Sequence, residues 1–361
     1  MIDVCHIITD SNLGGAGRWV QTLCRYLPRN RFRVTVIFPR GSRLEEILKG
    51  ERVCLCPAPI TADSSFCKKD LAVYSRLLAQ LRPAVVHTHG CATARLAAKL
   101  KGIPTVFTKH TVGEPMTGMK KRLNSLLCTR AIAVSRYAQE SLERDGIPSQ
   151  KIRMIYNACP DRGKSPDTEA AKEGLQIPKG KLVVGMFARL SEEKGWQAMC
   201  QAICLAKEKR LPLFFLLAGG GPLEPALRQQ LEGCPVRFLG ELTDIGPALH
   251  ACDAVCVPSL EESFGLTALE AMTASLPVVA TRVGGLGEVL GQADELTVKP
   301  GDGESLLKAF ENLQDDPLRR KLGARGRKRY EELFSPSGFA QRVAALYEEI
   351  INHKKKGGAK E

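Results

Sequence analysis

The feature of this sequence that most constrains its fold is an alternation of short apolar runs with helical patterns. In the first half, residues 2–8, 33–38 and 104–108 are apolar runs that alternate with segments of helical periodicity. Residues 182–188, 213–218 and 254–257 repeat this rhythm in the second half. Alternation of this kind is typical of parallel sheets that carry helices on both faces. The class is therefore α/β.

The length and one polar stretch divide the chain in two. The 361 residues exceed the roughly 250–300 at which a single core usually stops growing. Residues 157–179 are polar and are broken by three prolines, a composition typical of a boundary. We predict two Rossmann-like domains, over residues 1–160 and 181–335, joined by a linker over 161–180. Their parallel sheets are expected to face each other across a cleft.

A glycine-rich loop, residues 12–17, follows the first predicted strand and opens a helix. In open α/β sheets, ligands bind beyond the carboxyl ends of strands, where helix N-termini favour anions. Gly14 and Gly15 let a ligand approach the backbone there. The alternative is that these glycines serve only a tight turn. The loop does not match the dinucleotide-binding pattern G-x-G-x-x-G.

Two cations flank the loop after the first strand of the second half. Arg189 and Lys194 lie five residues apart in the segment ARLSEEKG. Such a pair can hold a diphosphate from two sides, because arginine offers a bidentate fork and lysine a mobile point charge. The alternative is an ordinary solvated run of charges.

The strongest local signal is the segment PSLEESFGLTALEAM, residues 258–272. Glu262 lies in a predicted loop and Glu270 lies eight positions later, in the helix that follows. The backbone amides of Phe264, Gly265 and Leu266 lie between them, at a helix N-terminus that suits an anion. One carboxylate on each side suits the hydroxyls of a hexose and of a ribose. The alternative, two unrelated surface glutamates, explains this pattern poorly.

Together these motifs resemble the retaining glycosyltransferases of family 4, of the bacterial polysaccharide type, whose fold is called GT-B. The resemblance covers nearly the whole chain. It rests on the segments already quoted and on six others: HTH at 87–89, AVSRYAQ at 133–139, IYNA at 155–158, AGGGP at 218–222, LGEL at 239–242 and PVVATRVGGLGEVL at 277–290.

The resemblance implies roles for the residues of the second half. Arg189 and Lys194 would neutralise the diphosphate of a nucleoside diphosphate sugar and stabilise the leaving group. Glu262 would hold hydroxyls of the donor sugar, and Glu270 those of the ribose. The amides of residues 264–266 would contact the sugar or the phosphate. No metal and no other cofactor is expected, since no D-x-D occurs and the two cations can take a metal's place.

In the first half, the resemblance implies an acceptor-binding domain. His110 would lie beside the reacting sugar, and Gly15 near the diphosphate. Gly14 and His89 are weaker candidates for contacts with the acceptor. His87 and His89 share one face of a predicted strand, so structural hydrogen bonding is the other interpretation. The helix predicted over 336–361 would cross back to the first domain and end in a basic tail.

Two departures from the family pattern stand out. The usual N-G-x-D reads Asn157-Ala-Cys-Pro160 here, so the aspartate is absent or moved to Asp161. The usual glycine of E-G-F-G is Ser263. Neither departure removes a residue with a proposed chemical role.

Charge is concentrated in the first half of the chain. The formal net charge is +13, and residues 1–180 hold 29 Lys and Arg against 15 Asp and Glu. An anionic partner is therefore expected for that half, and the run Lys120-Lys121-Arg122 is the candidate contact for an anionic membrane surface. An ordinary solvated basic face is the alternative. With only 6% aromatic residues and no nucleic-acid motif, nucleic-acid binding is not expected.

The predicted location is the cytoplasm, with peripheral attachment to the inner face of the membrane. The apolar runs are too short to span a bilayer, and the first ten residues lack the pattern of a targeting segment. Thirteen cysteines without a C-x-x-C pair suit buried thiols in a reducing compartment, the alternative being a metal or redox role.

The sequence thus predicts a retaining hexosyltransferase that uses a nucleoside diphosphate sugar, with UDP favoured over GDP by family frequency. Its acceptor would be a hydroxyl of a sugar or a lipid-linked sugar, in the synthesis of cell-surface polysaccharide or glycolipid. The alternatives are a catalytically inactive GT-B scaffold and a GT-B enzyme of the epimerase or phosphorylase type.

Overall fold

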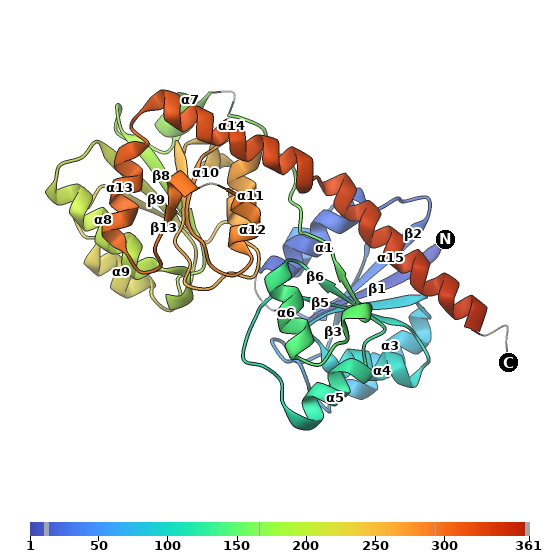
Figure 1. Cartoon of the computed structure of the whole chain (residues 1–361). Helices are drawn as coiled ribbons and strands as arrows, with labels where there is room; N and C mark the ends of the chain where they lie inside the picture. Colours follow the sequence, from blue (N-terminus) through green and yellow to red (C-terminus); the bar gives the residue numbers. More distant parts are fainter. Residues whose placement is uncertain (11–13, 166, 293, 358–361) are drawn as a thin grey trace. The chain divides into compact units, whose positions relative to one another are not determined.

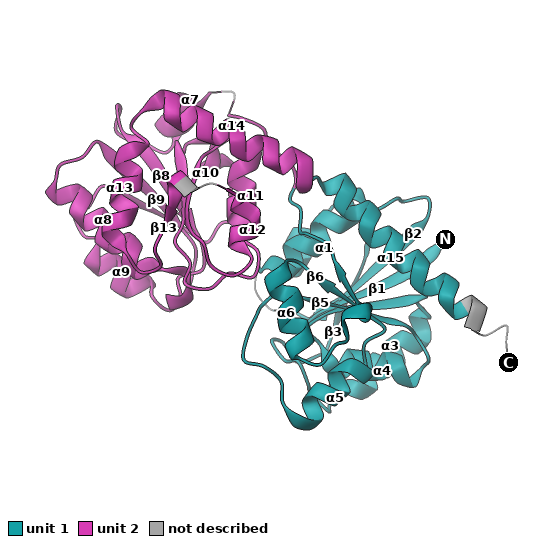
Figure 2. Ribbon diagram, in the orientation of Figure 1, with its two compact units in different colours: residues 1–159, 335–361 teal, residues 160–334 magenta. Residues whose placement is uncertain are grey.

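A computed structural model describes residues 1–10, 14–165, 167–292 and 294–357. The chain forms two compact units (Figure 2). Unit 1 comprises residues 1–159 together with 335–361, and unit 2 comprises residues 160–334. Each unit is an α/β structure built on one parallel sheet (Figure 1).

The sheet of unit 1 has seven strands in the order β3-β2-β1-β4-β5-β6-β7, and every pairing between them is parallel. The strands are β1 (Ile2–Ile8), β2 (Phe32–Pro39), β3 (Cys54–Ala58), β4 (Val85–His89), β5 (Thr105–Lys109), β6 (Arg130–Ala133) and β7 (Ile152–Met154). The helices are α1 (Gly15–Tyr26), α2 (Leu44–Leu48), α3 (Asp70–Leu81), α4 (Ala92–Leu100), α5 (Gly118–Leu126), α6 (Arg136–Arg144) and α15 (Pro336–Gly357).

Strand β1 is buried on both faces because helices cover both sides of the sheet. Val4 and Ile8 belong to the core formed with α1 and α15, whereas Cys5 and Ile7 belong to the core formed with α3 and α4. Side chains alternate between the two faces of a strand, so His6 lies on the same face as Val4. A polar side chain therefore occupies the face that α1 and α15 cover.

One strand of unit 1 contains a proline: β3 spans Cys54–Ala58 and includes Pro57. Proline cannot donate a backbone hydrogen bond, yet β3 is an edge strand and pairs only with β2. The edge position is what allows the strand to continue through the proline.

The sheet of unit 2 has six parallel strands in the order β10-β9-β8-β11-β12-β13. The strands are β8 (Leu182–Phe187), β9 (Leu213–Ala218), β10 (Val236–Gly240), β11 (Ala254–Val257), β12 (Val278–Thr281) and β13 (Thr297–Val298). The helices are α7 (Thr168–Gly174), α8 (Trp196–Glu208), α9 (Glu224–Gln230), α10 (Gly246–His250), α11 (Leu266–Thr273), α12 (Leu286–Leu290), α13 (Gly303–Asn312) and α14 (Asp316–Leu333).

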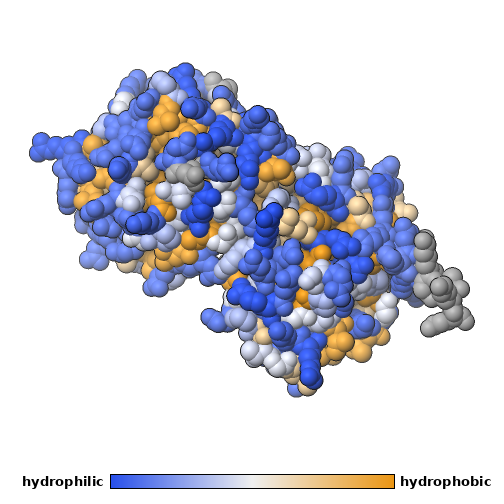
Figure 3. Space-filling model, in the orientation of Figure 1, coloured by the Kyte–Doolittle hydropathy of each residue, from blue (hydrophilic) through white to orange (hydrophobic). Residues whose placement is uncertain are grey.

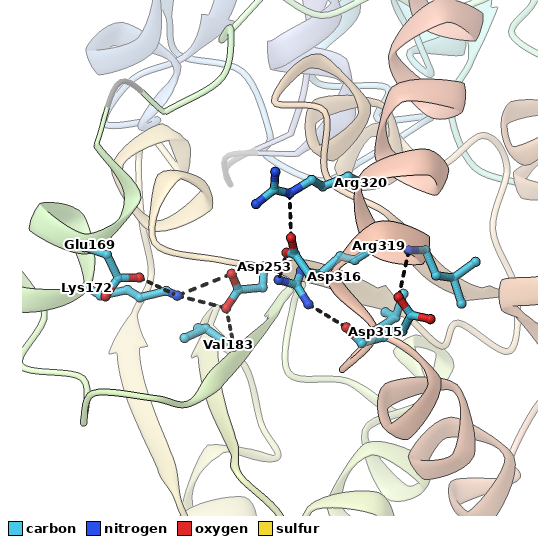
Figure 4. Close-up of polar contacts among 10 residues, drawn as sticks. Glu169, Lys172, Val183, Asp253, Asp315, Asp316, Arg319 and Arg320 are labelled. Carbon is cyan, nitrogen blue, oxygen red and sulfur yellow. Dashed lines mark hydrogen bonds and ion pairs between the residues drawn. The ribbon is translucent and has the colours of Figure 1, made fainter.

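The stretch predicted as a linker, residues 161–180, lies within unit 2 and contains α7. Lys172 of α7 forms ion pairs with Glu169 and Asp253, at 3.1 and 3.0 Å (Figure 4). The Asp253 carboxylate also accepts a hydrogen bond from the backbone N–H of Val183 in β8, at 2.8 Å. These contacts attach α7 to the sheet of unit 2.

Among the described residues, no helix is both long and apolar enough to cross a bilayer. The face drawn in Figure 3 is hydrophilic over most of its area, and hydrophobic residues form small separate patches there.

Candidate active site

The predicted donor-site residues of unit 2 lie in loops at the carboxyl ends of β8 and β11. In the sheet, β8 lies between β9 and β11. After β8 the chain forms β9 and β10 on one side of it, and then crosses to form β11 on the other side. Such a reversal of strand order is where open α/β sheets bind ligands. The topology therefore places Arg189, Lys194 and Glu262 beyond the carboxyl ends of two central strands, where a ligand is expected.

Gly195 allows the loops after β8 and β11 to touch through their backbones. Its φ is +75°, and a Cβ at this position would lie 1.9 Å from the carbonyl oxygen of Pro258. Nearby, the backbone N–H of Leu260 donates to the carbonyl of Glu193 at 2.8 Å. A glycine is therefore required at position 195, both for its conformation and for lack of space.

This backbone contact brings Lys194 and Glu262 together. The Nζ of Lys194 donates to Oε2 of Glu262 at 2.8 Å, although the residues are 68 positions apart in the chain. Both side chains are mostly buried, with 22% and 17% of their surface exposed. A cation and a carboxylate with different predicted roles thus form one ion pair.

Arg189 has a fixed backbone and an exposed guanidinium. Its carbonyl accepts a hydrogen bond from Nε1 of Trp196 at 2.8 Å, and its side chain is 65% exposed. The guanidinium pairs with Glu193 at 3.0 Å. Partial burial acts to raise the pKa of the Glu193 carboxyl, but hydrogen bonds from Ser191 and Arg189 outweigh it, so that pKa is lowered. Sequence reasoning did not identify Glu193 or Trp196.

The N-terminus of α11 is held in place by its neighbours. Gly265 precedes the helix with a φ of +104°, and a Cβ there would meet the Leu286 side chain at 2.5 Å. The ring of Phe264 is buried against Phe334, with centroids 5.8 Å apart. In the first turn, the Thr267 hydroxyl donates to the carbonyl of Phe187 at 3.0 Å. The backbone N–H groups of residues 264–266 are therefore positioned next to the end of β8.

Glu270 lies in the second turn of α11, beside an arginine that the sequence analysis missed. The Nη2 of Arg162 is 3.7 Å from Oε1 of Glu270, and its Nη1 is 2.7 Å from Oδ1 of Asp244. Arg162 belongs to the stretch predicted as a linker. Because that stretch contains several charged residues, nothing in the sequence distinguishes Arg162 as part of a site.

Asp161, the candidate replacement for the missing family aspartate, has a partner on α14. Its Oδ2 accepts a hydrogen bond from Nη2 of Arg327 at 2.6 Å, and this arginine lowers the pKa of the Asp161 carboxyl. The aspartate therefore attaches the start of unit 2 to one of its own helices.

In unit 1, Gly14 and Gly15 form the start of α1. Gly14 has an extended conformation and its carbonyl accepts the N–H of Arg18 at 3.3 Å, while Gly15 is the exposed first residue of the helix. Residues 12 and 13 of the predicted loop lie outside the described residues. No left-handed conformation at Gly14 demands a glycine there.

His110 and His89 lie at the ends of the neighbouring strands β5 and β4 and contact each other. The distance from His89 Nδ1 to His110 Nε2 is 2.8 Å, and His89 is only 5% exposed. The other ring nitrogen of His89 lies 3.0 Å from Nδ1 of His6. Burial lowers the pKa of His110 and of His6 to about 3, so both are neutral at pH 7.

The fold matches solved structures along almost the whole chain. HepE from Anabaena, in complex with UDP and glucose, aligns with a TM-score of 0.83 at 20% identity, over 96% of this chain and 100% of that one. Sucrose-phosphate synthase from Thermosynechococcus elongatus aligns with a TM-score of 0.78 at 20% identity, over 98% and 100%. Two parallel α/β units of this form define the GT-B class of glycosyltransferases.

Family models and relatives agree with this class. The model described as glycosyltransferase family 4 matches residues 13–161, and the model described as glycosyl transferases group 1 matches residues 181–316. The chain therefore belongs to the family 4 type of glycosyltransferases. Among its relatives, the 2-deoxystreptamine glucosyltransferase of Streptomyces kanamyceticus is 28% identical over 72% of this chain and 74% of its own. The N-acetyl-alpha-D-glucosaminyl L-malate synthase of Bacillus anthracis is 27% identical, over 73% of each chain.

Proposed function

We propose that this glycosyltransferase is a retaining hexosyltransferase that takes a sugar from a UDP-sugar and needs no metal. The observation that carries this proposal is the Lys194–Glu262 pair, 2.8 Å apart, whose glutamate lies three residues before Gly265, the N-cap of α11. A cation, a carboxylate and helix amides in adjacent loops supply what a sugar diphosphate requires: charge neutralisation, acceptors for sugar hydroxyls, and donors for an anion.

In this proposal, Lys194 and Arg189 stabilise the negative charge that develops on the diphosphate as the sugar departs. Preorganised cations do this without reorganisation, because they are in place before the bond breaks. Lys194 is held by Glu262, whereas the Arg189 side chain is 65% exposed and can turn toward a ligand. Glu270, beside Arg162, accepts the ribose hydroxyls.

Retention is proposed to follow from attack on the same face of the sugar as the leaving phosphate. The acceptor oxygen forms the new bond to the anomeric carbon as the bond to the diphosphate breaks, and a diphosphate oxygen takes the hydroxyl proton. Unit 1 is assigned to the acceptor, and the half-buried, neutral His110 is assigned to the reacting sugar.

The relatives support the choice of donor and acceptor class. HepE was solved with UDP and glucose, and the relative from S. kanamyceticus is named as a glucosyltransferase. For this chain we propose an acceptor hydroxyl on a sugar or a lipid-linked sugar, in the synthesis of cell-surface polysaccharide or glycolipid.

We also propose that α5 attaches the enzyme to an anionic membrane on the cytoplasmic side. Met119, Leu123 and Leu126 are 68%, 45% and 65% exposed, and their spacing places them on one side of the helix. The basic residues 120–122 stand between them and are exposed. An apolar stripe flanked by lysine and arginine is typical of a helix that lies in the bilayer interface.

The donor proposal is tested by thermal shifts with UDP, GDP, ADP and their common sugars, with and without EDTA. A ligand at about 100 times its Kd should add roughly 2.7 kcal/mol of stability. A UDP-specific shift that survives EDTA is expected. Transfer is then assayed with the matching sugar, and Arg189→Ala should lower kcat by about 10²–10³. No shift with any nucleotide would favour the inactive scaffold instead.

The membrane proposal is tested by flotation with vesicles that contain phosphatidylglycerol. The double variant M119D/L123D should lose binding, because negative charges replace two of the exposed apolar side chains that would enter the bilayer interface. Leu100 is 69% exposed at the end of α4, outside this stripe, so L100D is the matched control and should still bind. Equal flotation of both variants would refute a role for α5.

A further inference from the structure

Six buried or half-buried polar side chains form one continuous chain of hydrogen bonds in unit 1. The links are Thr108 Oγ1 to His87 Nε2 at 2.7 Å, His87 Nδ1 to the Tyr347 hydroxyl at 2.6 Å, that hydroxyl to His6 Nε2 at 3.3 Å, His6 Nδ1 to His89 Nε2 at 3.0 Å, and His89 Nδ1 to His110 Nε2 at 2.8 Å.

The sheet and α15 bring these groups together. His6 lies in β1 and is paired in register with His87 in the adjacent β4, and His89 is two positions farther along the same face. Thr108 lies in the next strand, β5, and His110 is the first residue after that strand ends. Tyr347 reaches the chain from α15, which packs on this face of the sheet.

The four imidazoles of the chain are neutral. His6 and His87 are fully buried, and His89 is 5% exposed. Burial lowers the pKa of all four histidines, and neighbouring imidazoles add to this effect at His87 and His89. A neutral imidazole carries one N–H, so one ring nitrogen donates and the other accepts.

Counting protons leaves few arrangements for such a chain. If His110 donates from Nε2 to His89, then His89 must donate from Nε2 to His6, and His6 from Nε2 to the Tyr347 oxygen. If instead His6 donates from Nδ1, then His89 and His110 also carry their protons on Nδ1. Each link needs one proton and each ring has one to give, so the tautomers of these three histidines are tied together.

The Tyr347 hydroxyl extends this coupling to His87. The hydroxyl is fully buried between two imidazoles, and it can donate to one only if it accepts from the other. Turning its proton away from both would leave a buried donor without an acceptor, which costs about 1–3 kcal/mol. The Tyr347 hydroxyl therefore accepts from one imidazole and donates to the other, which couples the tautomer of His87 to that of His6.

We propose that these side chains form a proton-ordered relay with two states, in which all four histidines carry their proton on Nδ1 or all four carry it on Nε2. When the relay changes from the Nδ1 state to the Nε2 state, one proton enters at the Thr108 end and one leaves from Nδ1 of His110, so the number of bound protons is unchanged. The relay determines whether Nδ1 of His110 is a donor or an acceptor. Tyr347 is then a positioning residue for His110, an assignment that rests on the proposed role of His110 in transfer.

The rival occupant of this cluster is a metal ion. One ring nitrogen from each of His6, His87 and His89 could be offered to an ion, and these atoms lie within 4.8 Å of one another. Both ring nitrogens of each histidine, however, already lie at hydrogen-bonding distance from another group of the relay. A metal would have to break these bonds, so the two alternatives give different nitrogen spectra.

The test is long-range ¹H–¹⁵N NMR on full-length protein labelled with [¹⁵N]histidine. The chain has six histidines, and His250 and His353 lie outside the relay, so the variant H250Q/H353Q leaves only the four relay imidazoles. One tautomer, or the same average of two tautomers, is expected for all four at pH 7.5. A mixture of tautomers among them overturns the relay. A change of the ring nitrogen signals on adding one equivalent of Zn²⁺ overturns it in favour of a metal site.

Tyr347→Phe keeps the ring and removes the central hydroxyl. In this variant the ring nitrogen signals of all four histidines should change. This includes His110, to which Tyr347 does not bond directly. Tyr74→Phe is the matched control, since Tyr74 is buried in the same unit with its hydroxyl near Cys91. It should leave the histidine signals unchanged. A change confined to His6 and His87 in Y347F would overturn the coupling.

Kinetics separate the relay from the proposed function. For Y347F we expect kcat about tenfold lower, the low end for loss of a residue that orients a functional group, with the donor KM within about twofold. Uniform tautomers with an unchanged kcat would overturn the role of Tyr347 in positioning. The NMR result needs no activity, so an enzyme that transfers no sugar would refute the proposed function and leave the relay standing.

Discussion

Acidification should destabilise unit 1 selectively, because its histidines are buried in the neutral form. The pKa of His6 is about 3 in the folded protein and about 6.5 in an unfolded chain. Between these two values the unfolded state binds the proton and the folded state does not. The free energy of unfolding therefore falls as the pH drops below about 6.5, and it continues to fall until about pH 3.

The magnitude follows from the size of the shift. Each pH unit between the two pKa values costs about 1.4 kcal/mol for each histidine. From pH 7 to pH 5, His6 alone should lower the free energy of unfolding by about 2 kcal/mol, since its side chain is fully buried. His87, His89 and His110 act in the same direction, because burial lowers the pKa of each. The total is a large part of the roughly 5–15 kcal/mol that stabilises a typical domain.

The assay is urea unfolding at pH 7, 6 and 5, combined with hydrogen exchange and mass spectrometry to follow each unit. Peptides from β1 and β4 should lose protection at lower urea as the pH falls, whereas peptides from β8 and β9 in unit 2 provide the internal control. Equal urea midpoints for unit 1 at pH 7 and pH 5 would refute the neutral, buried state of these histidines. An equal loss in both units would assign the effect to the net charge of the chain.

Three further predictions concern unit 2. Lys194→Met should lower kcat by about 10²–10³, because it removes a preorganised cation, whereas Lys209→Met, at an exposed site, should leave kcat unchanged. Similar rates for both variants would contradict the role of Lys194. Gly195→Ala should lower the free energy of unfolding by about 3 kcal/mol or more, since a Cβ would lie 1.9 Å from a backbone oxygen. A urea midpoint like that of the unaltered protein would show that the loops after β8 and β11 do not pack in this way. Glu262→Gln should reduce transfer at least tenfold in a product assay, whereas the exposed neighbour in Glu261→Gln should tolerate the change; equal activity would remove Glu262 from the site.

Features that depend on neighbours along the chain could be predicted from the sequence. Apolar runs alternating with helical patterns led to parallel sheets, because strand and helix have different periods and each hides its own apolar face. The helix that begins after Gly265 was predicted in the same way, and α11 spans Leu266–Thr273. The donor-site motifs are also local, since Arg189 and Lys194 share one loop and Glu262 precedes the helix that carries Glu270.

Contacts between distant segments were decided only by the tertiary structure. The pairing of Lys194 with Glu262 depends on β8 and β11 being neighbours in the sheet, which strand periodicity does not encode. Arg162, beside Glu270, could not be recognised within a polar stretch. Tyr347 bonds His6 across 341 positions of sequence, because α15 packs on the face of the sheet that presents the histidines. A local pattern specifies which face of a strand or helix is buried, but the side chain that meets it there is selected by packing of the whole unit.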